Sequence, residues 1–95
     1  MAKVKTTVFD AAKYLNTPEA ISVYLEDIFE TEDAELIAHA LGTVARAKGM
    51  TEVARKTGLS RESLYKALSA EGNPEFATIL KVMRALDLKI TARAG

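Results

Sequence analysis

The stretch GMTEVARKTGLSRESLYKAL, residues 49–68, decides the fold of this chain. Residues 51–57 and 60–68 each have the spacing of a short helix, and Gly58 lies between them. Glycine readily adopts the left-handed backbone conformation that ends many helices, so Gly58 predicts a turn, after which Leu59 returns to the core. Two helices joined by three or four residues that include a glycine form a helix-turn-helix arrangement.

The two helices of this stretch are expected to begin at capping side chains. Thr51 is expected to cap the first and to leave its N-terminal amides near a phosphate, and Ser60 to cap the second. The residues predicted to face inward are Val53, Ala54, Leu64, Ala67 and Leu68. The outer face and front end of the second helix then present Ser60, Arg61, Glu62, Tyr65 and Lys66.

These exposed side chains suit DNA. A helix in the major groove contacts bases through its N-terminal residues. Arg61 can bond guanine with two hydrogen bonds, and Glu62 can accept one from the amino group of cytosine. Ser60 can bond several base edges, and Tyr65 suits a phosphate or the thymine methyl group.

The charge around this stretch supports the same hypothesis. Residues 46–66 hold six basic and two acidic side chains, a net charge of +4 that favours the phosphate backbone. We assign Arg55 to backbone contact, since its loss should weaken binding to every sequence alike. The predicted DNA-binding set is Thr51, Arg55, Ser60, Arg61, Glu62, Tyr65 and Lys66.

Two further helices are predicted before this stretch. Thr17 and Pro18 favour the start of a helix over 18–30, with a buried apolar stripe formed by Ile21, Tyr24, Leu25, Ile28 and Phe29. The next helix begins in the polar segment Thr31–Glu35 and ends at Gly49, and Gly42 inside it is expected to allow a close helix contact. Residues 9–15 are predicted to form a short helical turn capped by Asp10.

The end of the chain predicts one helix and one strand. Asn73 is expected to cap the last helix and Pro74 to occupy its first turn. Its predicted buried residues are Phe76, Ile79, Leu80, Val82, Met83 and Leu86, as core or dimer interface. Residues 88–93 alternate apolar and polar side chains as a short strand does, and a lone strand needs a partner, such as one from a second subunit.

Composition limits the classes of function. The 95 residues, with 48% hydrophobic and 27% charged residues, predict a single soluble domain over 1–95. No cysteine and no long apolar run occur, which favours a cytoplasmic protein without a membrane span. Residues 1–45 carry a net charge of −5 and residues 46–95 a net charge of +5, a division that indicates two kinds of partner.

Enzymatic chemistry is not predicted. His39 is the single histidine, and without cysteine its available co-ligands are carboxylates at poor spacing. The acidic run from Glu30 to Glu35 lacks the glycine of a calcium loop and fits the positive end of a helix. We therefore expect no catalytic residues, no metal, no cofactor and no small-molecule substrate.

The chain also resembles a known family. The segments FDAAKYL, YLEDIF, ALGTVARAKGM, GLSRESLYKAL and GNPEFATILKVMRALDL are similar to those of the addiction-module antidote family, HigA-like antitoxins with an Xre-type helix-turn-helix. The resemblance implies an all-α, five-helix, lambda-repressor-like fold and a homodimer on operator DNA. It also implies neutralisation of a RelE-like toxin, usually small, that cleaves mRNA. On this reading, residues 9–45 form the acidic N-terminal helices and residues 46–88 the DNA-binding portion.

Two alternatives stay open at this point. One is a phage-type transcriptional repressor without a toxin partner, and the other is a helical interaction module that never binds DNA. The acidic N-terminal half favours the antitoxin, because a simple repressor needs only the basic half, and complementary charge suits a basic toxin.

Overall fold

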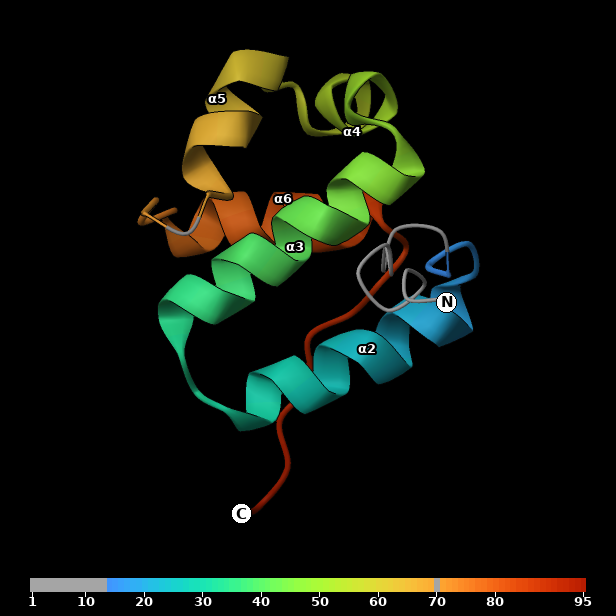
Figure 1. Cartoon of the computed structure of the whole chain (residues 1–95), viewed down its shortest axis with the longest axis vertical. Coiled ribbons are helices and arrows are strands. Elements are labelled where there is room, and N and C mark those ends of the chain that lie inside the picture. The colour runs from blue at the N-terminus through green and yellow to red at the C-terminus, as the bar shows by residue number, and fades with distance from the viewer. Residues whose placement is uncertain (1–13, 70) are drawn as a thin grey trace, which may run out of the picture.

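The structure, a computed structural model, describes residues 14–69 and 71–95. Within these ranges the chain forms five helices and no strand (Figure 1). They are α2 (Pro18–Glu30), α3 (Ala34–Lys48), α4 (Met50–Thr57), α5 (Arg61–Ala67) and α6 (Phe76–Ala85). This confirms the predicted all-α class and is consistent with a small domain of the helix-turn-helix type. Most of the predicted turn over 9–15, including its capping Asp10, lies outside the described residues.

The first two described helices begin as their capping residues predict. Thr17 accepts a hydrogen bond from the Ala20 N–H at 3.1 Å, and Pro18 occupies the first position of α2. The helix after it begins at Ala34, inside the predicted segment Thr31–Glu35 but not at its first residue. Thr31 instead ends α2, because its hydroxyl donates to the Ile28 carbonyl at 2.6 Å. The Asp33 carboxylate then caps α3 by accepting from two backbone N–H groups.

The predicted start of the last helix is wrong. Neither Asn73 nor Pro74 begins it: α6 starts at Phe76, after an extended Glu75, and no side chain caps it. The reason lies at Gly72, where a Cβ atom would approach the carbonyl oxygens of Lys66 and Ala67 too closely to fit. The connection must therefore pass close to the end of α5 before a helix can begin.

The core is formed where α3, α4, α5 and α6 meet. Its most deeply buried large side chains are Leu41, Val44, Val53, Leu64, Val82 and Leu86. α2 covers α3 on the other side and adds Ile21 and Leu25 to the same cluster. These contacts confirm the inward-facing residues predicted for the 49–68 stretch, of which Ala54 and Ala67 are partly rather than fully buried.

The predicted burial along α2 and α6 is wrong at three residues. Phe76 is 66% exposed, Leu80 41% and Phe29 37%. Val82 and Met83 are buried as predicted, as is Leu86 at the end of the helix. Since side chains four residues apart share a helix face, Phe76 and Leu80 lie together at the edge of the buried stripe, beyond the neighbouring helices.

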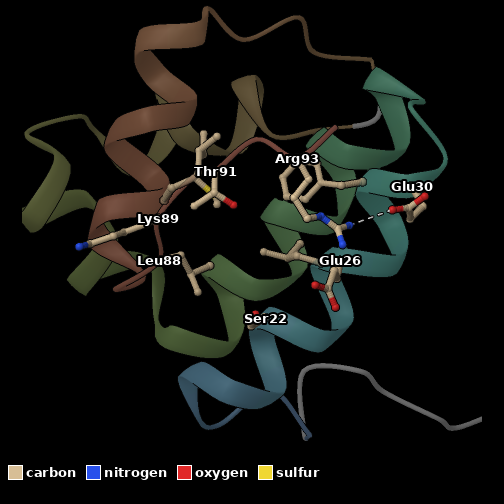
Figure 2. Close-up of a pocket in the computed structure, with 11 residues that line it drawn as sticks. Ser22, Glu26, Glu30, Leu88, Lys89, Thr91 and Arg93 are labelled. Carbon is tan, nitrogen blue, oxygen red and sulfur yellow. Dashed lines mark hydrogen bonds and ion pairs between the residues drawn. The ribbon is translucent and has the colours of Figure 1, made fainter. Parts of the chain in front are cut away.

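The predicted C-terminal strand over 88–93 is absent from the described chain. These residues are extended but have no neighbouring strand within residues 14–69 and 71–95. They run beside α2, where Arg93 donates a hydrogen bond to the Glu30 carboxylate at 3.4 Å (Figure 2). A strand needs a backbone partner to form, and the adjacent element is a helix whose own backbone groups are already paired.

Gly42 confirms the prediction of a close helix contact and yields a test. A Cβ atom at this position would lie 2.7 Å from the carbonyl oxygen of Leu68, which ends α5. Alanine is normally about 1 kcal/mol better than glycine inside a helix. We predict the opposite sign here: Gly42→Ala should lower the free energy of unfolding in urea by about 1 kcal/mol or more, because backbone must move.

The matched control is an exposed position within a helix. At Lys81 in α6, the Ala variant should be about 1 kcal/mol more stable than the Gly variant. If Gly42→Ala is more stable than wild type by about as much as Lys81→Ala is more stable than Lys81→Gly, the α3–α5 contact is not tight.

Candidate nucleic-acid interface

The turn between α4 and α5 is formed as its glycine predicts. Gly58 has the left-handed conformation, with φ of 77° and ψ of 10°, and its N–H donates to the Ala54 carbonyl. α4 ends at Thr57 and α5 begins at Arg61, so three residues separate the two helices. Leu59 packs against the core from within this turn.

Thr57 stabilises the same turn, a role that sequence analysis missed. Its side chain is buried, its hydroxyl donates to the Ala54 carbonyl at 3.3 Å, and its oxygen accepts from the Leu59 N–H at 3.2 Å. A threonine directly before the glycine was the available signal, since short polar side chains often bond turn backbone.

Ser60 caps α5 as predicted. Its hydroxyl oxygen accepts from the Ser63 N–H at 3.0 Å, and the two serine hydroxyls lie 2.9 Å apart. Leu64 is fully buried and Leu68 nearly so, and together they hold one face of this short helix against the core. The remaining face is therefore fixed in orientation.

The predicted outer side chains of α5 do lie at the surface. Ser60, Arg61, Glu62, Tyr65 and Lys66 are all exposed. Tyr65 remains 47% exposed although it is aromatic. In the described part of the chain, Arg61 and Lys66 take part in no salt bridge. This face thus presents two unpaired cations, one carboxylate and hydroxyl groups to any partner.

Thr51 does not have its predicted capping role. The N-cap of α4 is Gly49, with φ of 110°, and no side chain accepts from the first-turn amides. Thr51 instead lies inside the first turn and is exposed. The physical reason is that Gly49 both ends α3 and begins α4, so the second helix starts earlier than a threonine cap would allow.

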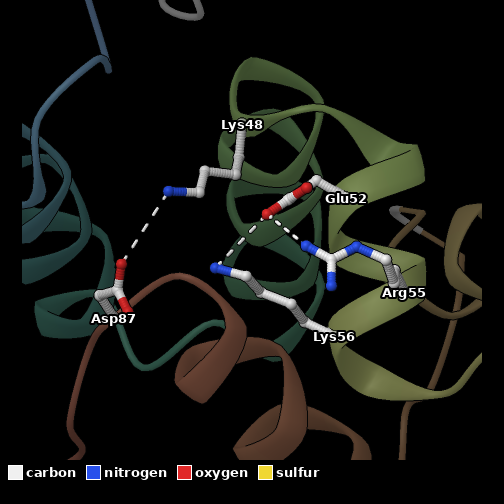
Figure 3. Close-up of polar contacts among 5 residues, drawn as sticks. All are labelled: Lys48, Glu52, Arg55, Lys56 and Asp87. Atoms are coloured by element: carbon white, nitrogen blue, oxygen red, sulfur yellow. Dashed lines mark hydrogen bonds and ion pairs between the residues drawn. The ribbon is translucent and has the colours of Figure 1, made fainter.

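Arg55 is exposed but carries an ion pair that sequence reasoning missed. Its guanidinium lies 2.9 Å from the Glu52 carboxylate, and the Lys56 ammonium lies 3.6 Å from the same oxygen (Figure 3). The spacings of three and four residues on α4 were the available signal. Glu52 therefore offsets part of the positive charge that the composition of this stretch predicts.

Tertiary structure adds a second carboxylate to this region. Asp87, just after α6, lies 3.9 Å from the Lys48 ammonium at the end of α3 (Figure 3). Three of the six cations within residues 46–66 are thus in ion pairs, namely Lys48, Arg55 and Lys56. In the described chain the other three, Arg46 on α3 and Arg61 and Lys66 on α5, form no salt bridge.

Part of α3 lies beside the exposed face of α5, although the two are about twenty residues apart in the sequence. Tyr65 shares a shallow hollow of about 240 Å³ with His39 and Arg46 of α3. Arg46 donates to the Thr43 hydroxyl at 3.3 Å and is exposed. His39 and Arg46 are seven residues apart on α3, which is about two helical turns. This spacing was the sequence signal that places the two side chains on the same face.

The Glu52 pKa is lowered by its partners. The main cause is the hydrogen bond from Arg55, followed by the positive charge of the same group, and Lys56 adds a smaller effect in the same direction. Because the folded-state pKa is depressed, the ion pair stabilises the fold above the ordinary pKa of a glutamate. That contribution is lost as the pH falls through the folded-state value.

Other kinds of site are not found in the described residues. Over residues 14–69 and 71–95, no three histidine, cysteine or acidic side chains are grouped as metal ligands would be. No helix in the same ranges has the length and apolar character to span a membrane.

Comparison with known proteins identifies the family. The structure is a small all-helical domain with an exposed polar helix. Residues 5–94 match the sequence model of a family described as "Probable addiction module antidote protein". A Haemophilus influenzae protein named only "Uncharacterized protein" is 53% identical over 81 residues, which cover 85% of this chain and 84% of the relative. No solved structure matches.

The chain therefore belongs to the family of probable addiction module antidote proteins. Membership suggests an antitoxin, which implies a toxin partner in general, and the family description names no catalytic activity.

The Glu52 ion pair leads to a measurable prediction. Arg55→Ala should raise the Glu52 pKa toward its ordinary value, because the hydrogen bond that favours the carboxylate is removed. Carboxyl-carbon NMR titration of wild type, Arg55→Ala and Lys56→Ala measures this directly. Lys56→Ala should produce the smaller rise, and equal values in all three proteins would contradict the ion pair.

Proposed function

We propose that this chain is the antitoxin of a type II toxin-antitoxin module, that it represses its own operon, and that it neutralises a RelE/HigB-like mRNA-cleaving toxin by direct binding. Family membership supports the antitoxin role. The observation that carries the DNA-binding part is the fixed, exposed face of α5, with its two unpaired cations at a capped helix. The cytoplasm is the compartment in which both activities would take place.

Base recognition on this proposal comes from the N-terminal half of α5. We identify α4 and α5 as a helix-turn-helix of the Xre type, similar to that of HigA antitoxins, within a DNA-binding portion over 46–88. Burial of Leu64 leaves Arg61 and Glu62 at the front of the helix, where a major groove would meet them. Tyr65 and Lys66 follow on the same exposed side.

Backbone contacts would come from around α5. The first-turn amides of α4 at Thr51 have no side-chain cap, which leaves them for a phosphate oxygen. Arg55 would exchange or share its Glu52 partner with a phosphate, and Arg46 lies beside Tyr65. These contacts position the helix without selecting a sequence.

A homodimer follows from the size of one recognition helix, which covers a half-site. We place the dimer contact on the exposed edge of α6, at Phe76 and Leu80. Two antiparallel α6 helices that cross at Leu80 would bring Arg84 of each copy near Phe76 and Glu75 of the other. Such a contact is symmetric and pairs a cation with both an aromatic ring and a carboxylate.

A phage-type repressor without a toxin partner is the alternative function. It would use the same α5 face, so DNA binding does not separate the two. The discriminating observation is an adjacent reading frame for a small basic protein that binds this chain. Its absence, together with failure to co-purify such a protein, would favour the repressor.

DNA recognition is tested at Arg61. Arg61→Ala should weaken binding to the DNA upstream of the gene by about 1 to 3 kcal/mol, or roughly fivefold to 150-fold, and should affect random DNA much less. Fluorescence anisotropy on both DNAs over a series of salt concentrations measures the affinity and its salt dependence.

Arg55→Ala is the control for backbone contact. It should weaken binding to both DNAs alike and reduce the slope of log K against log salt by about one per contact. If Arg61→Ala lowers affinity equally on upstream and random DNA, its assignment to base recognition is wrong.

The dimer contact is tested at Phe76. Phe76→Ser should raise the dimer dissociation constant about tenfold or more, because an aromatic side chain that becomes buried in an interface often dominates its energy. Sedimentation equilibrium measures the constant, and Val23→Ser, an equally exposed apolar position on α2, serves as the control. Equal dimerisation by all three proteins would place the contact elsewhere.

A further inference from the structure

A groove on the other side of the molecule has no role in the proposed DNA contacts. It has a volume of about 330 Å³ and lies between α2 and the C-terminal segment 88–93 (Figure 2). Leu25 and Met83, both buried, line its interior with Leu88. Phe29 and Ile90 are its partly exposed apolar edges. The groove is large enough for one or two apolar side chains of a partner.

The two walls of this groove carry opposite charge: Glu26 and Glu30 line it from α2, and Lys89 and Arg93 line it from the C-terminal segment. Residues 14–45 contain seven aspartate and glutamate side chains and neither lysine nor arginine. In the described chain, Glu30 is the single member of this set that forms a salt bridge, and its partner is Arg93. Glu26 lines the groove and lacks such a partner within the same residues. The α2 wall, where Glu26 has no ion-pair partner among the described residues, therefore favours a cationic group of a partner.

The wall formed by the C-terminal segment is held lightly. Among the described residues, the backbone of residues 89–95 makes no hydrogen bond to other backbone groups. The polar contact that joins this segment to α2 is the Arg93–Glu30 pair at 3.4 Å, whose two side chains are both largely exposed. Exposed pairs contribute about 0 to 1 kcal/mol. A cation from a partner could therefore replace Arg93 at Glu30 with little loss of stability.

We propose that this groove binds a basic, amphipathic segment of the toxin. The inference rests on the proposed antitoxin function and assigns its toxin-binding surface. Apolar side chains of the segment enter between Phe29 and Ile90, and its lysine or arginine side chains pair with Glu26 and Glu30. Apolar contact then supplies affinity, while charge complementarity increases the association rate and discriminates against acidic partners.

The position of the groove has a consequence for regulation. α2 lies at one end of the long axis of the molecule, and α4 and α5 lie at the other (Figure 1). A toxin seated on α2 therefore leaves the exposed face of α5 accessible. Toxin and operator DNA bind the same chain at the same time.

The experiment uses the full chain and the small basic protein encoded beside its gene. The two are co-expressed, the basic protein is released with denaturant and refolded, and its affinity for each variant is measured by isothermal titration calorimetry. Glu26→Lys and Phe29→Ala should each weaken binding about tenfold or more. Circular dichroism establishes that each variant is folded.

Two variants on the same helix are matched controls. Asp27→Lys makes the same charge change one residue from Glu26, and Val23→Ala shortens an exposed apolar side chain, yet neither residue lines the groove. Both should change the affinity by less than about threefold, since Asp27→Lys alters only long-range attraction and Val23→Ala removes no atom that lines the groove. Chain already bound to operator DNA should bind the basic protein about as tightly as free chain.

The outcomes separate the two proposals. Equal binding by wild type and all four variants would overturn the groove assignment and leave the antitoxin function intact. If wild-type chain binds no small basic protein encoded beside it, both proposals fail. If Glu26→Lys weakens self-association but not toxin binding, the groove holds a second copy, and its assignment to the toxin is wrong.

Discussion

The close contact between Gly42 in α3 and the backbone of Leu68 determines how the other functional surfaces are placed. The carbonyl oxygen of Leu68 lies where a side chain at position 42 would be, so α3 and α5 approach more closely than any residue but glycine permits. With Leu64 buried at the same time, α5 has a single orientation, and its polar face points outward. Gly42 and Leu68 also line the hollow that Tyr65 shares with His39 and Arg46.

Charged side chains are distributed unevenly along the long axis of the molecule, which has α2 at one end and α4 and α5 at the other (Figure 1). The described part of the first half carries carboxylates without lysine or arginine, and these lie around α2 and the start of α3. Glu52 and Asp87 pair with Lys48, Arg55 and Lys56, so the cations of residues 46–66 that form no salt bridge in the described chain are Arg46 on α3 and Arg61 and Lys66 on α5. The protein thus presents opposite charge at its two ends, which suits a basic protein at one and DNA at the other.

Local signals predicted local structure well. Thr17, Gly58 and Ser60 act within three or four residues of their own positions, and each ends or begins a helix as its chemistry predicts. The failures at Thr51 and Asn73 share a different cause. At both places a glycine in the preceding connection sets where the helix begins. Gly49 starts α4 directly after α3, and Gly72 packs against the backbone at the end of α5 before α6 can begin.

The sequence alone determined the helical class, the turn at Gly58, the exposed set on α5 and the division of charge, because periodicity, capping and composition are local properties. Tertiary structure alone decided which apolar residues are buried, since Phe76 and Leu80 share the helical spacing of Met83 but remain exposed while Met83 is buried. It also decided that Asp87 neutralises Lys48 and that residues 88–93 line a groove with α2 instead of forming a strand. Burial and pairing depend on which surfaces meet, and that information is held in contacts between residues distant in the chain.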